Sequence, residues 1–99
     1  MSGFKITNGK GFHITFENGW TVSIQFGWGN YGANYDNEAL MYRSDRKVER
    51  EIKSNTAEIA AWDKDHKWHE FEDGDTVAGY KSVEDVFEFM QIIQQKEAA

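Results

Sequence analysis

The sequence of 99 residues contains no cysteine and no proline. Without cysteine, the chain can form neither a disulfide framework nor a thiolate metal site. Without proline, no turn is set by a fixed backbone φ angle. Long apolar runs and an apolar leader segment are also missing, so we expect neither a membrane span nor a secretory signal. The absence of cysteine fits a reducing compartment, and we expect the protein in the cytoplasm.

Positive charge is scarce. The chain has 17 acidic side chains against 11 Lys and Arg, which gives a net charge of −6. Proteins that bind nucleic acids usually carry a basic stripe, whereas the basic cluster between Arg43 and Lys53 is interrupted by acidic residues. We therefore expect no direct binding to duplex DNA. The acidic surface suits solubility alone, or a basic partner protein.

Apolar and polar residues alternate in three early segments, residues 4–6, 12–16 and 20–26. A period of two predicts strands with one buried face. Turn residues at 8–10 and 17–19 separate the three segments. We therefore expect an antiparallel meander of three strands with one apolar face.

The loop length between the second and third segments decides which face the apolar residues share. A two-residue loop would send the apolar sets around Phe16 and Trp20 to opposite faces. A three-residue loop at 17–19 puts them on one face, with Gly19 in the left-handed conformation that a G1 bulge needs. The predicted apolar partners are Phe16 with Trp20, Ile14 with Val22, Phe12 with Ile24, Ile6 with Phe12, and Phe4 with Ile14.

The second half of the chain predicts further strands and one helix. Residues 56–62 read as a strand, 67–71 as its returning partner, and 76–80 as a short extended segment. Ser82 followed by Asp85 resembles a capping box. An apolar stripe at helical spacing follows it and comprises Val83, Val86, Phe87, Phe89, Met90, Ile92 and Ile93.

These elements predict one α+β domain over residues 1–99, with an antiparallel meander of about five strands packed on one C-terminal amphipathic helix. Residues 37–55 fit this scheme poorly, and we expect either a charged helix or a mobile, irregular insertion there. One helix is too small to cover five strands, and edge strands invite pairing, so we expect a homodimer.

The stretch FGWGNYGANYD, residues 26–36, contains the letters of the dinucleotide fingerprint G-x-G-x-x-G. That fingerprint needs a parallel βαβ unit, which antiparallel hairpins do not provide. Two interpretations remain: the aromatic rings fold back on the sheet edge, or they form a recognition surface near the arginines. The candidate binding residues are Trp28, Asn30, Tyr31, Asn34, Tyr35, Arg43, Arg46 and Arg50.

Metal binding and catalysis have little support in the sequence. His66 and His69 are three residues apart in a strand or turn, where side chains point in different directions. The chain has no cysteine nucleophile and no G-x-S-x-G elbow. We expect no metal, no cofactor and no enzymatic activity.

Residues 8–34, NGKGFHITFENGWTVSIQFGWGNYGAN, resemble an N-terminal pattern of small uncharacterised phage and prophage proteins. The pattern often has proline and cysteine in the loop, where this chain has Trp28 and either Gly32 or Ala33. If the cysteine serves chemistry, its absence further weakens an enzymatic interpretation. Small acidic phage proteins are frequently antagonists of host defence, so the resemblance implies a role in the host cell.

Three hypotheses follow. The first is a non-catalytic phage-type protein that binds a host protein through an acidic and aromatic surface and antagonises a defence system. The second is an oligomer that sequesters a nucleotide signal of the cyclic-nucleotide or ADP-ribose type. The third is a minor structural or accessory phage protein.

Overall fold

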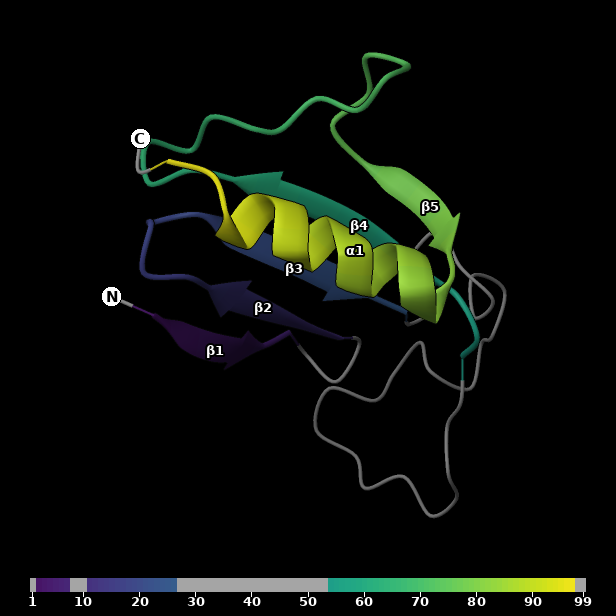
Figure 1. Cartoon of the computed structure of the whole chain (residues 1–99). Helices are drawn as coiled ribbons and strands as arrows, with labels where there is room; N and C mark the ends of the chain where they lie inside the picture. The colour runs from purple at the N-terminus through teal and green to yellow at the C-terminus, as the bar shows by residue number, and fades with distance from the viewer. Residues whose placement is uncertain (1, 8–10, 27–53, 98–99) are drawn as a thin grey trace.

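A computed structural model describes residues 2–7, 11–26 and 54–97. Within these residues, five antiparallel strands form one sheet in the order β1-β2-β3-β4-β5, and one helix lies across it (Figure 1). The predicted α+β class, with a meander sheet and a C-terminal helix, is confirmed. The elements are β1 (Gly3–Ile6), β2 (Gly11–Thr15), β3 (Thr21–Gln25), β4 (Ala57–Trp62), β5 (Ala78–Lys81) and α1 (Val83–Gln94).

The predicted register of β1, β2 and β3 is confirmed. Phe4 lies opposite Ile14 and Ile6 opposite Phe12, and the β2–β3 pairs match the prediction as well. The Phe16 amide donates to the Trp20 carbonyl at 2.9 Å, which closes the three-residue loop. Gly19 has φ 89°, the left-handed region where a Cβ would be strained.

The returning strand predicted at residues 67–71 is wrong. Trp68 makes only an isolated bridge to Trp62, and β5 pairs with β4 instead. The Asp63 carboxylate accepts the amides of Asp65 and Lys67, at 2.9 and 3.0 Å, and so holds a tight turn after β4. The turn returns the chain to β4, where the His69 amide donates to the Ala61 carbonyl at 2.8 Å, and the pairing ends after the single bridge.

The strand that pairs with β4 is irregular. A register shift lies between Ala57 and Ile59, and Tyr80 on β5 has φ 53°. β5 therefore carries an extra residue, as in a β-bulge. The predicted extended segment at 76–80 lies close to β5 but begins and ends earlier than the strand does.

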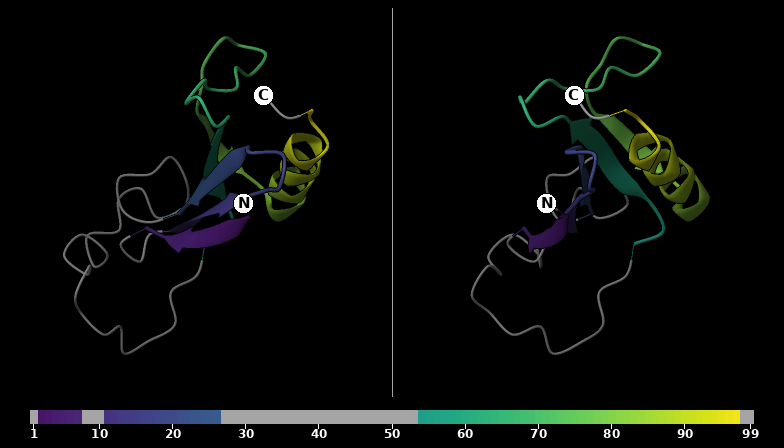
Figure 2. Two further views of the ribbon diagram at one scale, coloured as in Figure 1. Left: turned by 90° about the vertical axis from the view of Figure 1, so that its left-hand side faces the viewer. Right: turned by 60° about the vertical axis from the view of Figure 1, so that its left-hand side comes forward.

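Helix α1 begins at the predicted cap. The Ser82 hydroxyl accepts the Asp85 amide at 3.1 Å, and the Asp85 carboxylate accepts the Ser82 amide at 3.4 Å. Reciprocal bonds of this kind satisfy amides that have no partner inside the helix. The helix packs over β3 and β4 on one side of the sheet (Figure 2). The buried core is Val22, Ile24, Ala57, Ile59, Ala61, Phe89 and Ile93.

The insertion predicted at residues 37–55 lies outside the described residues except for Ser54 and Asn55. Of the described part of the chain, no helix has the length and apolarity that crossing a bilayer requires.

Candidate functional site

The predicted binding residues are not among those that the structure describes. Trp28, Asn30, Tyr31, Asn34, Tyr35, Arg43, Arg46 and Arg50 all fall within residues 27–53. Phe26, directly before this segment, is described, and it borders an apolar hollow of the described surface.

This hollow is an open apolar cleft of about 260 Å³ between α1 and the β2–β3 part of the sheet. The cleft exists because α1 covers β3 and β4, while the apolar face continues past it onto β2 and β1. Its described lining is Phe12, Ile24, Phe26, Ser54, Asn55, Thr56, Ala57, Lys81, Val83, Val86, Phe87 and Met90.

One side of helix α1 forms a wall of the cleft. Val83, Phe87 and Met90 are spaced four and three residues apart, so they lie along the same side of the helix. Val83 is 68% exposed and Phe87 is 59% exposed, although both are apolar. Contiguous exposed apolar surface of this kind is typical of a binding site.

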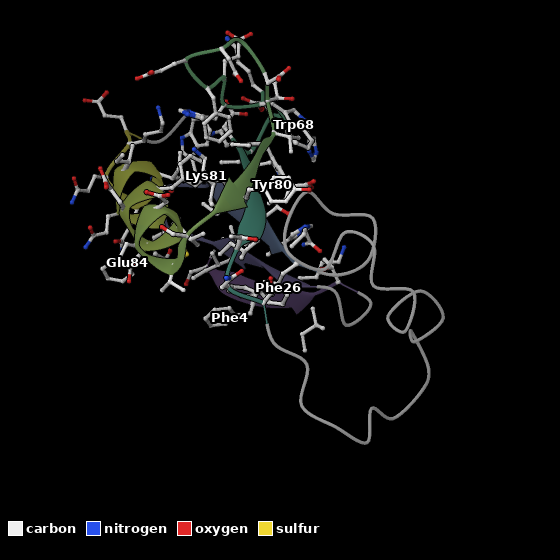
Figure 3. The ribbon with its side chains drawn as sticks, turned by 90° about the vertical axis from the view of Figure 1, so that its right-hand side faces the viewer. Phe4, Phe26, Trp68, Tyr80, Lys81 and Glu84 are labelled. Atoms are coloured by element: carbon white, nitrogen blue, oxygen red, sulfur yellow. The ribbon has the colours of Figure 1, made fainter. Side chains whose placement is uncertain are left out.

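The apolar surface continues from the cleft to the sheet edge. Phe4 and Ile6 on β1 line a shallower hollow that shares Phe12 and Phe26 with the cleft. The Phe4 and Phe12 rings are 6.4 Å apart between centroids. Figure 3 shows Phe4 and Phe26 near each other at this end of the sheet. The two hollows therefore form one apolar surface.

Charged groups border the cleft without filling it. Lys81 and Ser54 contribute polar atoms to the lining. Glu84 and Glu88 are exposed and each follows a cleft residue by one position, so they lie on the solvent side of the helix wall. The rim along α1 is therefore acidic, and it favours a partner with basic groups beside its apolar ones.

A second aromatic group lies around Trp62, near the turn after β4. The Trp62 and Trp68 rings are 4.8 Å apart, and His13 meets Trp62 edge-on at 5.0 Å. Burial lowers the pKa of His13, and the positive charge of Lys5 lowers it further. Trp68 is 45% exposed, whereas Trp62 is half-buried. Figure 3 shows Trp68 and Tyr80 on the side of the sheet away from α1.

The predicted divergence of His66 and His69 agrees with the structure. His66 is exposed in the turn at φ 61°, whereas His69 packs edge-on against the rings of Phe71 and Phe89, with centroids 5.0 and 5.4 Å away. Burial lowers the pKa of His69, and Lys96 adds a smaller electrostatic contribution. Among the residues described, no three His, Cys, Asp or Glu side chains come together as a metal site would require.

Sequence reasoning missed the cleft, although a signal for it was present. The three N-terminal strands carry more apolar positions than one twelve-residue helix can cover. That mismatch predicts uncovered apolar surface somewhere on the sheet, but it does not say where the helix will lie. Comparisons with protein-family models, with curated proteins and with solved structures find no match to this chain.

Proposed function

We propose that the protein is a non-catalytic binding protein whose cleft takes an apolar segment of a partner protein with basic flanking residues. One observation carries the proposal: the cleft has an apolar lining, and two exposed acidic residues of α1 lie beside its helix wall. Val83 and Phe87 are more than half exposed on the helix wall, and Glu84 and Glu88 lie beside them. Exposed aromatic side chains in a hollow are typical binding anchors.

The resemblance of residues 8–34 to phage proteins extends this proposal. On that ground we propose that the partner is a host protein in the cytoplasm of the infected cell, and that binding antagonises a defence system. The net charge of −6 supports a basic partner, because opposite charges speed the encounter of two proteins.

The test compares two single substitutions on the same helix. Phe87→Asp puts a charge in the cleft, and Ile92→Asp puts the same charge at a residue 51% exposed but outside the cleft lining. Both variants should fold, since neither side chain belongs to the buried core. Each protein is immobilised, and the proteins retained from a host lysate are compared by quantitative mass spectrometry.

We expect the wild type and Ile92→Asp to retain the same partner and Phe87→Asp to lose it. The double variant Glu84→Lys/Glu88→Lys should weaken retention most at low salt, where surface charge is least screened. Equal retention by all four proteins, or no retained protein at all, would contradict the proposal.

Sequestration of a nucleotide remains the alternative function. It depends on candidate residues outside the described part of the chain, while of the described cleft residues Lys81 is the one that carries positive charge. Calorimetric titration with cyclic dinucleotides and ADP-ribose derivatives tests it directly. Stoichiometric presence in purified virions would instead favour a structural or accessory role.

A further inference from the structure

Strand β1 is an edge of the sheet in the described part of the chain, and its side chains are exposed to solvent. All residues from 2 to 6 are exposed. Phe4 is 77% exposed and Ile6 is 79% exposed, and both belong to the apolar face. An exposed edge strand with apolar side chains is a template for pairing with another strand.

The hydrogen-bond pattern shows which backbone groups of β1 face outward. The Thr7 amide donates to the Gly11 carbonyl at 3.1 Å, which makes Thr7 and Gly11 a hydrogen-bonded pair. Hydrogen-bonded and non-hydrogen-bonded pairs alternate along an antiparallel ladder. Lys5 therefore bonds inward to β2, whereas the amides and carbonyls of Phe4 and Ile6 point away from β2, to a side where the described residues place no strand.

We propose that β1 pairs with β1 of a second copy of this chain, about a two-fold axis that passes through Phe4. Antiparallel pairing with a two-fold axis perpendicular to the sheet keeps both apolar faces on the same side. Residues opposite each other across the new ladder point to the same face of the sheet. The two-fold axis must therefore relate two copies of the same residue, because neighbouring residues of a strand point to opposite faces. The pairing joins two five-stranded sheets into one, with both helices on one side.

The choice of Phe4 follows from the side chains of β1. An axis at Lys5 would put two ammonium groups directly opposite each other, which is destabilising. An axis at Phe4 puts Phe4 against the partner's Phe4 and Lys5 against the partner's Gly3, which has open space around it. Ile6 then lies opposite the partner's Ser2, and residues 2, 4 and 6 all direct their backbone groups to the new ladder.

Charge along the strand also suits a second copy. Lys5 lies towards one end of β1, and Glu17 lies at the other end, where its carboxylate accepts the Ser2 hydroxyl at 2.9 Å. An antiparallel two-fold brings the partner's Lys5 towards the end that holds Glu17. The Phe4-centred pairing therefore keeps the two Lys5 ammonium groups apart along the ladder and sets no like charges directly opposite each other.

The exposed area of the strand places the proposed contact among small, transient interfaces. Phe4 and Ile6 together offer roughly 300 Å² of exposed surface, given the size of such side chains. With the rest of the strand, each copy falls somewhat short of the ~800 Å² that a standard interface buries on each partner. We therefore expect a dimer that dissociates on dilution, on the order of micromolar concentration.

Light scattering and sedimentation across a concentration series test the dimer. The wild type should approach twice the chain mass of 11.5 kDa at high concentration and fall towards one chain mass on dilution. Phe4→Glu, which puts two carboxylates on the axis, should remain a monomer throughout. Ile92→Glu, an equal charge far from β1, should behave as the wild type. A wild-type monomer at every concentration, or an unchanged Phe4→Glu dimer, would overturn the proposal.

The register is tested separately by cross-linking, because the chain has no cysteine of its own. In the proposed dimer the two copies of residue 4 are about 5.5 Å apart between Cα atoms, a span that a disulfide bridges. Two copies of residue 5 are offset by about 7 Å along the strands, and two copies of residue 6 by about 14 Å. Phe4→Cys should thus form the disulfide-linked dimer fastest under mild oxidation, and faster linkage of Lys5→Cys or Ile6→Cys would overturn the Phe4-centred pairing.

The dimer and the proposed function can fail independently. The β1 edge and the α1 wall of the cleft are on different elements. A Phe4→Glu monomer that still retains the host partner would leave the proposed function intact. Loss of the partner in Phe87→Asp, with the dimer preserved, would leave the pairing intact.

Discussion

The side chain of Asn18 ties the β2–β3 turn to the end of helix α1. Its Nδ2 group donates to the carbonyls of Ile93, Gln94 and Lys96 at 2.9, 3.1 and 2.9 Å, and its Oδ1 atom accepts the Trp20 amide at 3.0 Å. The last carbonyls of a helix have no partner inside it. One amide group therefore supplies the C-terminal cap from the opposite end of the sequence.

We expect Asn18→Ala to lower the free energy of unfolding by about 2 kcal/mol. The side chain makes one bond to the turn and at least two to the helix, each with a net value of about 0.5–1.5 kcal/mol. The partial exposure of Asn18 reduces the sum, because water reaches some of the released carbonyls. Asn18→Asp should cost more than Asn18→Ala, since it keeps the shape but directs a negative oxygen at three carbonyls and the negative end of the helix.

Asp73 provides a matched control. Its Oδ1 atom accepts the Asp75 amide at 3.0 Å, the same local turn bond that Asn18 makes to Trp20, and it is exposed. Asp73→Ala should therefore cost no more than about 0.5–1 kcal/mol. The difference between the two alanine variants isolates the contribution of the helix contacts.

Urea unfolding followed by circular dichroism measures these changes. The slope with denaturant should stay constant while the midpoint falls, since the same surface is exposed on unfolding. Native-state hydrogen exchange should show faster exchange in the last turn of α1. If Asn18→Ala and Asp73→Ala cost the same, the three helix bonds contribute nothing and the reasoning is refuted.

Three further predictions concern single sites. Gly11→Ala should lower the free energy of unfolding by more than about 2 kcal/mol, because a Cβ there would lie 2.0 Å from the Ile24 carbonyl oxygen. Gly3 has open space around it, so Gly3→Ala should leave the stability unchanged in the same urea titration. Tyr80→Gly should raise the melting temperature by a few degrees, since it removes left-handed strain of about 1 kcal/mol at an exposed position; an unchanged or lower value would contradict this. Burial lowers the pKa of His69, so below pH ~6.5 the unfolded chain binds more protons than the folded one. The free energy of unfolding therefore falls as the pH is lowered through that range. His69→Phe should reduce this pH dependence in unfolding curves measured across the range.

The first three strands and the helix could be predicted because local rules were sufficient for them. Of a two-residue and a three-residue loop, the three-residue loop alone puts Phe16 and Trp20 on the same face of the sheet. That loop needs a residue in the left-handed conformation, and Gly19 adopts it. Ser82 and Asp85 formed the expected cap. In each case the deciding partners are within a few residues of one another.

The partner of β4 could not be predicted because its own sequence is a weak strand signal. Ala78 and Gly79 have low β propensity, and Tyr80 has a conformation that its residue type disfavours. The segment around Trp68 has a better pattern and returns to β4 through the turn held by Asp63, but it pairs there only at the Trp62–Trp68 bridge. Tertiary contacts thus overrode local preference.

The candidate site was less predictable than the fold. The cleft depends on where α1 settles across the sheet, and this placement follows from packing among residues distant in sequence, in the core cluster that holds Ile24, Phe89 and Ile93. The predicted residues of the 27–53 segment stay predictions. Phe26 is the point at which that segment joins the described surface.

The bond from Asn18 to the helix also has a consequence for the order of folding. Its partners are separated from it by 75 to 78 residues, whereas the β2–β3 hairpin closes over a three-residue loop. Local contacts form early, and those that close long loops form late. We therefore expect Asn18→Ala to speed unfolding and leave the refolding rate nearly unchanged, so that α1 docks after the transition state, onto a hairpin that is already in register.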